Sequence, residues 1–212
     1  MRGALYAAPL WSGLLAQGLQ RLAEGDAVGF LEATHNIGGP LPTEYHNTQE
    51  ATPASNCVDA DSPQDPDQFQ EMVQRAEERT PYFGAAWAYI VQPCLLWTAE
   101  DADRYTEPWD MPTSATILLI SRVFDPATPH SGAVAASQTL ANARLLTIDG
   151  WGHSYFEGGL STCANETMAT YLIDLQLPPA GAVCPEDAPP FSERVTDEPA
   201  EATPVSPSEV IP

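Results

Sequence analysis

The 212-residue sequence contains no lysine, and eight arginines supply all of its permanent positive side-chain charge against 29 acidic residues. The formal net charge is therefore -21 at pH 7. Nucleic-acid binding depends on clusters of basic side chains that neutralise phosphates, and the sequence has no such cluster. An anionic membrane surface is disfavoured for the same reason. The charge balance thus predicts neither a nucleic-acid partner nor a membrane partner.

Long hydrophobic runs are also absent. The unbroken apolar run near the centre of the chain, Ile117–Ile120, is far shorter than the roughly 20 residues that a membrane span needs. A mostly apolar stretch over 4–16 follows Arg2, as in a signal peptide, but Pro9 interrupts it and no A-x-A-like cleavage site follows. Apolar residues recur there at helical spacing, so we interpret this region as an amphipathic helix and predict no signal peptide in this chain.

No C-x-x-C pair occurs, which argues against a zinc site or a thioredoxin-like motif. The four histidines show no metal-ligand spacing and the aspartate-rich stretch 59–67 lacks the EF-hand pattern, so no metal or other cofactor is expected. The four cysteines favour two disulfides and hence an oxidising compartment; four buried free thiols in a cytosolic protein are the alternative. The simplest pairing joins Cys57 to Cys94 and Cys163 to Cys184, but the sequence alone leaves all three connectivities open.

The composition divides the chain into three segments. Residues 1–96 have a mainly helical pattern, and residues 97–184 begin with a proline-containing linker and continue with strands and helices. Residues 185–212 are rich in proline and in acidic residues. Such a composition buries too little apolar area to offset its ordering entropy, so a disordered acidic tail is predicted.

Several helices are expected outside the strands. Residues 1–34 have helical spacing, 35–66 are polar and turn-rich, and 67–90 are predicted to be helical again, with Asp67 as the N-cap. Pro81 is expected to break this pattern, before a short apolar helix over 83–91. A last helix is expected to begin near Ser161 and to run to about residue 175.

The segment 116–153 has the pattern of a strand, a turn, a helix, a second strand and a loop. The first strand, Thr116–Val123, is rich in Ile, Leu and Val with no alternation, which is typical of a strand covered on both faces. A helix is expected over about 130–141, and a second strand over 144–148. A right-handed crossover would place both strands in one parallel sheet with their C-terminal ends at the same edge.

Asp125 and His153 each lie just past the end of one of these strands, where open α/β sheets place their working residues. A nucleophilic hydroxyl needs a histidine to take its proton and a carboxylate to hold the histidine's tautomer. An acid before a histidine on successive strand ends is the order of the last two members of an α/β-hydrolase triad. Each residue alone has a plainer interpretation, because an Asp before Pro is usually a turn former and a lone His in a glycine-rich loop is usually structural.

Four stretches and one cysteine carry a family resemblance: I-L-L-I-S-R-V-F-D-P-A-T-P (117–129), A-R-L-L-T-I-D-G-W-G-H (143–153), S-T-C (161–163), Y-L-I-D-L-Q-L-P (171–178) and Cys184. With them, the region from about Trp97 to Phe191 resembles the C-terminal region of the tripeptidyl-aminopeptidase-like (TAP-like) α/β-hydrolases, in the proline-iminopeptidase superfamily. Residues 1–96 are similar, more loosely, to the helical cap, or lid, of these enzymes.

The resemblance implies an α/β fold: the C-terminal part of an α/β-hydrolase, with parallel strands and flanking helices in an incomplete sheet, plus a helical cap segment. It implies Asp125 as the triad acid, His153 as the triad base, and a Cys163–Cys184 bridge that pins the last helix to the segment after it. It also implies a secreted exopeptidase that releases short peptides from free N-termini of a peptide substrate. A cap carboxylate would be a partner for the substrate ammonium group; the candidates are Glu24, Asp26, Glu32 and Glu44, each more often a solvated surface charge.

The sequence departs from the family pattern at the nucleophile, because it contains no G-x-S-x-G motif and the context of Ser12, Ser131 and Ser154 is not that of a nucleophile elbow. We therefore expect a fragment of a serine-type hydrolase, whose N-terminal half is supplied in the same or a separate chain. Little catalysis is expected from two triad members alone. The alternative is a catalytically inactive binding module or a degenerate gene product.

Overall fold

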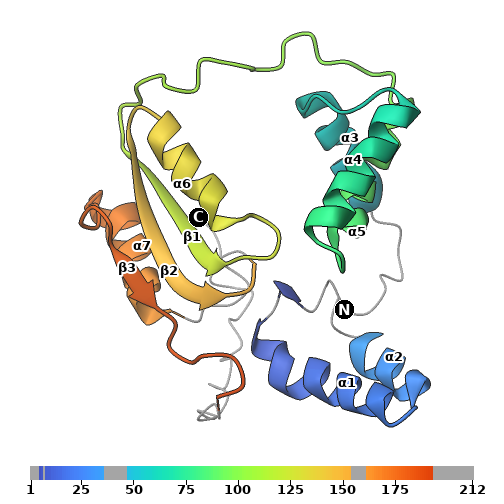
Figure 1. The fold of residues 1–212 in the computed structure, drawn as a ribbon. Helices are drawn as coiled ribbons and strands as arrows, with labels where there is room; N and C mark the ends of the chain where they lie inside the picture. The colour runs from blue at the N-terminus through green and yellow to red at the C-terminus, as the bar shows by residue number, and fades with distance from the viewer. Residues whose placement is uncertain (1–4, 7, 36–46, 154–160, 193–212) are drawn as a thin grey trace, which may run out of the picture.

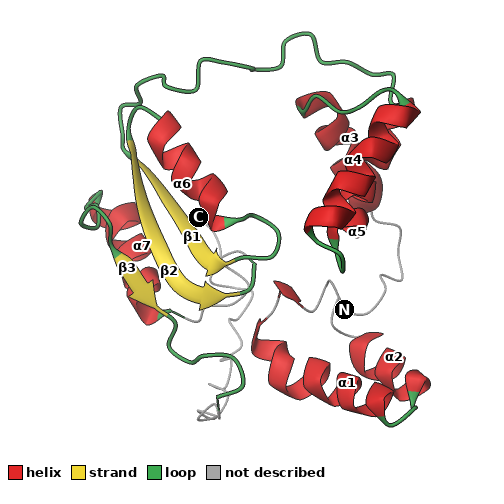
Figure 2. Cartoon of the chain, in the orientation of Figure 1, coloured by secondary structure: helices red, strands yellow, loops and turns green. Residues whose placement is uncertain are grey.

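The computed structural model describes residues 5–6, 8–35, 47–153 and 161–192. The described part of the predicted cap is helical, and a small α/β unit follows residue 116 (Figure 1). A long connection without helix or strand, which begins after Leu96, joins the two (Figure 2). Most of the predicted acidic tail, residues 193–212, lies outside the described residues.

The α/β unit is built on a parallel sheet of three strands in the order β1-β2-β3. The strands are β1 (Ile117–Phe124), β2 (Ala143–Trp151) and β3 (Val183–Pro185). Helix α6 (His130–Thr139) connects β1 to β2, and α7 (Thr162–Asp174) lies on the opposite side of the sheet (Figure 1). The predicted α/β class, with parallel strands and flanking helices, is confirmed.

The core of this unit lies between the sheet and α7. Leu146 and Ile148 of β2 are fully buried, together with Ala164 of α7 and Cys184 of β3. Residues 117–120 of β1 are half-buried and Val123 and Phe124 are exposed, so β1 is not covered on both faces as expected. The reason is that β1 is an edge strand among the strands that the structure describes, so it has a strand neighbour on one side alone.

Helix α7 begins and ends close to its predicted bounds. The Ser161 hydroxyl oxygen accepts a hydrogen bond from the Ala164 N–H at 3.2 Å, and this N-cap satisfies an otherwise unpaired helix donor. The same hydroxyl donates to the Pro185 carbonyl at 2.8 Å, next to β3. The Cys163–Cys184 disulfide joins the first turn of α7 to β3, as the resemblance implies. One disulfide and one hydrogen bond therefore fix α7 against the last strand.

The helical segment contains α1 (Ala16–Ala23), α2 (Ala27–His35), α3 (Thr48–Asp59), α4 (Pro66–Arg79) and α5 (Gly84–Ala88), followed by a 3₁₀ segment, Tyr89–Leu96. The Cys57–Cys94 disulfide links α3 to the 3₁₀ segment, so the structure adopts the simplest of the cysteine pairings. Phe69 and Val73 of α4 are buried against the elements that follow, with the Phe69 ring 5.5 Å from that of Tyr89.

Two expectations about local structure were wrong. Residues 48–59 form α3 although 35–66 was expected to be turn-rich, because Pro53 and many polar residues masked the helix. Helix α4 is capped by Asp65, not Asp67: its carboxylate accepts from the Asp67 N–H at 2.7 Å, and Pro66 takes the first helical position, where no N–H is needed. Helix α4 ends at Arg79 and α5 begins at Gly84, so the predicted break at Pro81 is confirmed.

Two further differences concern the strands. β2 continues through Trp151, so the residues expected to begin the His-bearing loop, 149–151, are in the sheet. β3 was not predicted, since three residues carry no recognisable strand periodicity and its pairing with β2 is a long-range contact. With β2 longer and β3 added, strand ends lie closer to Asp125 and His153 than the sequence pattern indicated.

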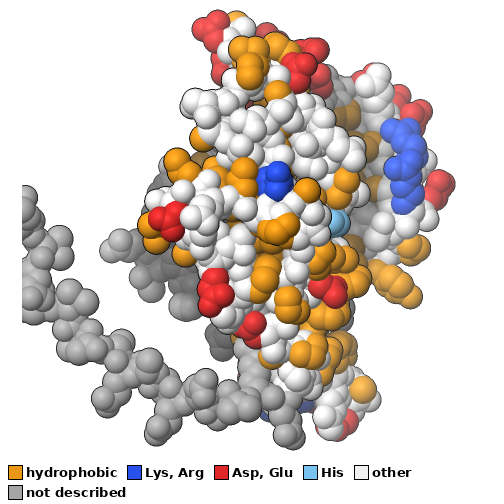
Figure 3. All heavy atoms as spheres, turned by 90° about the vertical axis from the view of Figure 1, so that its left-hand side faces the viewer, with side chains coloured by type: hydrophobic (Ala, Val, Ile, Leu, Met, Phe, Trp, Pro, Cys, Tyr) orange, Lys and Arg blue, Asp and Glu red, His pale blue; other side chains and the backbone are white. Residues whose placement is uncertain are grey.

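The face that carries α7 and β3 shows hydrophobic side chains among scattered acidic ones (Figure 3). Leu172 and Ile173 of α7 are 66% and 79% exposed, and Val183 of β3 is 61% exposed. No helix in the described ranges is long and apolar enough to cross a membrane. Clustered exposed apolar side chains of this kind are typical of surfaces that contact other protein.

Candidate active site

Asp125 is held in a turn that immediately follows β1. One carboxylate oxygen accepts hydrogen bonds from the backbone N–H groups of Ala127 and Thr128, each at 2.8 Å. The other accepts from the Thr128 hydroxyl at 2.9 Å. This is the local bonding that makes Asp a frequent turn residue, and it leaves the side chain 5% exposed. The turn thus fixes the carboxylate at the C-terminal edge of the sheet.

His153 lies two residues after the end of β2. Its backbone N–H donates to the Tyr6 carbonyl at 2.8 Å, and the Tyr6 ring meets the imidazole edge-on with centroids 4.8 Å apart. Gly152 before it has a φ of 97°, and a Cβ there would lie 2.8 Å from the Tyr6 oxygen. Glycine is therefore required at this position both by the backbone angle and by the close approach of the N-terminal segment.

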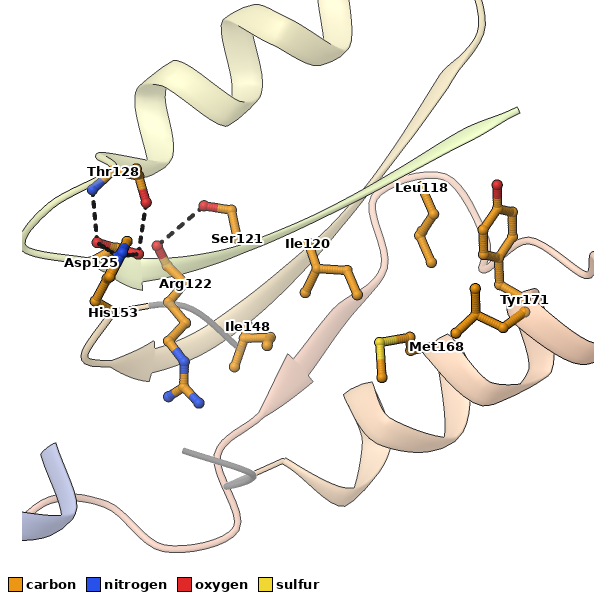
Figure 4. Close-up of a pocket in the computed structure, with 11 residues that line it drawn as sticks. Leu118, Ile120, Ser121, Arg122, Asp125, Thr128, Ile148, His153, Met168 and Tyr171 are labelled. Carbon is orange, nitrogen blue, oxygen red and sulfur yellow. Dashed lines mark hydrogen bonds and ion pairs between the residues drawn. The ribbon is translucent and has the colours of Figure 1, made fainter. Parts of the chain in front are cut away.

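The two side chains meet as the sequence predicts. The Nδ1 atom of His153 lies 3.0 Å from both carboxylate oxygens of Asp125 (Figure 4). An ionised carboxylate can only accept, so Nδ1 is the protonated ring nitrogen and Nε2 is free to accept a proton. The imidazole is 27% exposed while the carboxylate is buried. This is the arrangement in which a carboxylate orients a histidine that acts as a general base.

Hydrogen bonding keeps Asp125 ionised. Burial by itself would raise the pKa of Asp125, but the N–H groups of Thr128 and Ala127, together with the His153 ring and the Thr128 hydroxyl, lower that pKa below its ordinary value of 3.8. The carboxylate is therefore charged across the neutral range and available to His153.

The lowered pKa predicts a defined pH dependence of stability. Because folding weakens proton binding at Asp125, this contribution to stability is complete above pH 3.8 and is lost as the pH falls through the lower folded-state pKa. Asp125→Asn should remove that part of the acid sensitivity. Urea unfolding at a series of acidic pH values measures it: the free energy of unfolding of the wild-type chain should fall more steeply than that of the variant.

A matched control is Asp101→Asn. Asp101 also accepts a backbone N–H, from Asp103 at 3.0 Å, but in an exposed turn away from any histidine. This variant should keep the wild-type pH slope. An identical slope in wild type and Asp125→Asn would contradict the assignment of a stabilising hydrogen-bonded carboxylate.

A cavity of about 470 Å³ lies beside the acid–base pair, on the side of the sheet that α7 covers (Figure 4). Its lining is mainly apolar at the end far from His153 and polar near it. The residues that line it are Leu118, Ile120, Ser121, Arg122, Asp125, Thr128, Ile148, His153, Met168, Tyr171 and Leu172. An apolar cavity that converges on a few polar groups is the usual form of a small-molecule or substrate site.

The described residues do not complete a catalytic triad. No serine hydroxyl in the described ranges hydrogen-bonds to the His153 ring. Ser12 lies in the short helical turn before α1, Ser131 lies in α6, and Ser154 lies outside the described residues. Within the same ranges, no group of three or more His, Cys, Asp or Glu side chains could hold a metal ion.

Residues 80–184 match the family model described as TAP-like protein. This part of the chain belongs to the TAP-like family. The matched TAP-like domain contains Asp125, His153 and the Cys163–Cys184 disulfide, and it begins within the helical segment.

Curated relatives extend the similarity to most of the chain. The chain is 31% identical over 187 residues to carboxylesterase B of Mycobacterium tuberculosis (strain ATCC 25618 / H37Rv). The aligned region covers 85% of this chain and 35% of that protein. The chain is 31% identical over 190 residues to the serine protease Hip1 of the same strain, with the same two shares. It is 26% identical over 140 residues to the tripeptidyl aminopeptidase of Streptomyces lividans, covering 65% of this chain and 25% of that protein.

These relatives are named as an esterase and two peptidases, so the TAP-like domain belongs to a family of hydrolases. The chain spans about a third of the length of the first two and a quarter of the third.

The three described candidate partners for a substrate ammonium group, Glu24, Asp26 and Glu32, do not line the cavity of the TAP-like site. Asp26 accepts from the Gly29 N–H at 2.8 Å and lies 4.0 Å from Arg21. Glu24 is exposed at the C-terminal end of α1, and Glu32 is exposed on α2. Neither lines the cavity beside His153. Glu44 lies outside the described residues.

Two residues of the site were not singled out from the sequence. Arg122 is the one charged residue within the apolar run of β1, and a charge in such a run is a signal that could have identified it. Tyr6 contacts His153 from the N-terminal segment, and no local pattern indicates that contact. Arg122 interrupts a recognisable pattern, whereas the contact of Tyr6 with His153 depends on tertiary structure alone.

Proposed function

We propose that this chain supplies the acid and the base of a serine-type α/β-hydrolase, an exopeptidase that releases short peptides from free N-termini. The observation that carries the proposal is the contact of His153 Nδ1 with both carboxylate oxygens of Asp125 at 3.0 Å. The names of the peptidase relatives, serine protease and tripeptidyl aminopeptidase, support a peptide substrate over other acyl compounds.

In the proposed mechanism, Asp125 holds the Nδ1–H tautomer of His153. The Nε2 atom takes the proton of a serine hydroxyl as that oxygen attacks the scissile carbonyl carbon, and later gives the proton to the leaving amine. Water then repeats the sequence to release the acyl group. Asp125 stabilises the imidazolium formed in each half-reaction without itself becoming protonated.

We propose that the nucleophile comes from an N-terminal half of the hydrolase, in the same or a separate chain. Two features support this: the sequence has no G-x-S-x-G motif, and β1 has a free edge among the described strands. We call the combination of this chain with such a nucleophile-bearing half the assembled enzyme. In it, residues 1–96 would serve as the cap, since Tyr6 already contacts His153 and its ring lies 6.4 Å from that of Trp87.

An extracellular location is part of the proposal. The Cys57–Cys94 and Cys163–Cys184 disulfides are the kind of bond that forms and persists in oxidising compartments. The strongly acidic composition supports neither a nucleic-acid nor a membrane partner.

The assembled enzyme provides the test. The DNA upstream of the Met1 codon and the neighbouring reading frames identify the half that encodes G-x-S-x-G, and joint expression with this chain should produce a protein whose serine reacts with a fluorophosphonate probe. An Ala-Ala-Pro-p-nitroanilide substrate should be cleaved, and its N-acetylated counterpart should be cleaved at least about tenfold more slowly, because a free amine is recognised. p-Nitrophenyl butyrate serves as the ester control.

The results of these assays distinguish an exopeptidase from a carboxylesterase and from an inactive binding module. Equal cleavage of the free and acetylated peptides would contradict an exopeptidase, and cleavage of the ester alone would favour a carboxylesterase. No labelling of the assembled enzyme would support the inactive binding module, which the missing G-x-S-x-G motif favours.

A further inference from the structure

One ion pair among the described residues is buried. The side chains of Arg122 and Glu186 are 3% and 2% exposed and form a salt bridge through Arg122 Nη1 and Glu186 Oε1. The other arginine–carboxylate pairs in the described ranges have well-exposed partners: Arg21–Asp26, Arg75–Glu71 and Arg104–Asp61. Removing charges from water is costly, and a buried ion pair is often no more stabilising than apolar residues of the same shape. Its presence beside the site therefore calls for an explanation other than stability.

The pair connects the C-terminal ends of all three strands. Arg122 is near the end of β1, three residues before Asp125, and Glu186 directly follows β3. Between them lies the backbone of Trp151, the last residue of β2. Arg122 Nη1 donates to the Trp151 carbonyl at 2.8 Å, and the Trp151 N–H donates to Glu186 Oε1 at 3.4 Å. The peptide groups on both sides of Trp151, two residues before His153, are thus held by one charged pair.

Neighbouring contacts are shaped around this arrangement. A Cβ on Gly150 would lie 2.7 Å from the Glu186 carboxyl carbon, so glycine makes room for the carboxylate against β2. The Glu186 N–H also donates to the Asp149 carbonyl at 3.3 Å. The rings of Phe124 and Trp151 stack with centroids 5.1 Å apart, at the point where the β1–β2 register shifts. The end of β2 is therefore constrained on its β1 side and on its β3 side.

We propose that Arg122 and Glu186 are positioning residues that fix the end of β2, and so place the His153 imidazole against Asp125. Both residues act on His153 through the Trp151 backbone, whose carbonyl and N–H they bond next to the register shift between β1 and β2. The inference rests on the proposed acid–base role of Asp125 and His153, but the geometry that it concerns can be measured without turnover.

The test uses the full 212-residue chain labelled with ¹⁵N-histidine. A low-field proton resonance coupled to Nδ1 reports the His153–Asp125 hydrogen bond, and its loss in Asp125→Asn assigns it. The key variant is the double replacement Arg122→Met with Glu186→Leu, which removes both charges at similar volume. We expect it to unfold cooperatively with a midpoint near that of the wild type, but to lose the Nδ1–H resonance and to exchange the His153 amide at least about tenfold faster.

Two further variants keep the test decisive. Arg144→Met is the matched control, because Arg144 also lies in the sheet and donates through Nη1 to a backbone carbonyl, that of Pro178, away from the site; the resonance should persist. If the double variant does not fold, Arg122→Lys serves instead, since a compact ammonium lacks the planar fork that spans the Trp151 carbonyl and Glu186. In Arg122→Lys the resonance should be weaker than in the wild type. No Arg122 variant should reach the wild-type intensity.

The outcomes distinguish this inference from the proposed function. A wild-type chain without the Nδ1–H resonance would overturn both, because the acid–base contact itself would be absent. A resonance that is present in the wild type and unchanged in the folded double variant, or in Arg122→Lys, would overturn the positioning role alone. In the assembled enzyme the same variants should lower kcat by about 10²-fold with little change in KM, the effect of a misplaced catalytic group.

Discussion

Replacing His153 with alanine should lower the turnover number of the assembled enzyme by about 10⁶-fold, because the serine then has no base to take its proton. The imidazole is the one group in the described site that is oriented by a buried carboxylate and also partly open to the cavity. KM should change little, since the proton transfer belongs to the transition state and not to substrate binding. Steady-state kinetics on the peptide p-nitroanilide measure both constants.

Two comparisons make this result specific. Asp125→Asn should cost about 10⁴-fold, because an amide can present an N–H to Nδ1 and so favour the wrong tautomer. His130→Ala is the matched histidine control: its Nδ1 lies 3.2 Å from the Ser121 hydroxyl, at the start of α6, outside the acid–base pair. It should retain nearly all activity. Retained turnover in His153→Ala, or a loss in His130→Ala as large as that in His153→Ala, would contradict the assignment.

The acid–base pair could be predicted from the sequence because its placement depends on local patterns. The apolar run of β1, the alanine-rich helix α6 and the apolar run of β2 each have a recognisable period or composition, and the handedness of a βαβ unit then brings the strand ends together. Asp125 and His153 could be placed from these patterns, since Asp125 follows β1 directly and His153 lies two residues after β2. The role of either residue in catalysis stays a prediction until the kinetics above are measured.

The support of the pair could not be predicted in the same way. Glu186 is 64 residues from Arg122, and the three-residue strand before it exists through its pairing with β2. The contact of Tyr6 with His153 likewise joins the first turn of the chain to the end of β2. α3 was missed for a different reason: its Pro53 and polar residues favour a turn locally, and the Cys57–Cys94 disulfide is a tertiary constraint on that helix. Local preferences were overridden wherever distant segments meet.

The Cys163–Cys184 disulfide should make a large contribution to stability. It closes a loop with a sequence separation of 21, for which the loss of unfolded-state entropy corresponds to about 3 kcal/mol. The double variant Cys163→Ala with Cys184→Ala should therefore have a free energy of unfolding in urea about 3 kcal/mol lower than that of the wild type. Reductant should lower that of the wild type further, because it also opens Cys57–Cys94. Cys184 is 2% exposed in the core, so its alanine replacement adds a small cavity cost.

The effect of this disulfide should also reach the active site, because it holds β3 and Glu186 follows β3 directly. In the folded Cys163→Ala/Cys184→Ala chain, the Nδ1–H resonance of His153 should broaden. The matched control is Cys57→Ala with Cys94→Ala, which opens a longer loop, with a separation of 37, in the helical segment. That variant should lose comparable stability but leave the resonance unchanged. Equal broadening in both variants would mean that the resonance follows global stability, and that β3 has no particular part in placing His153.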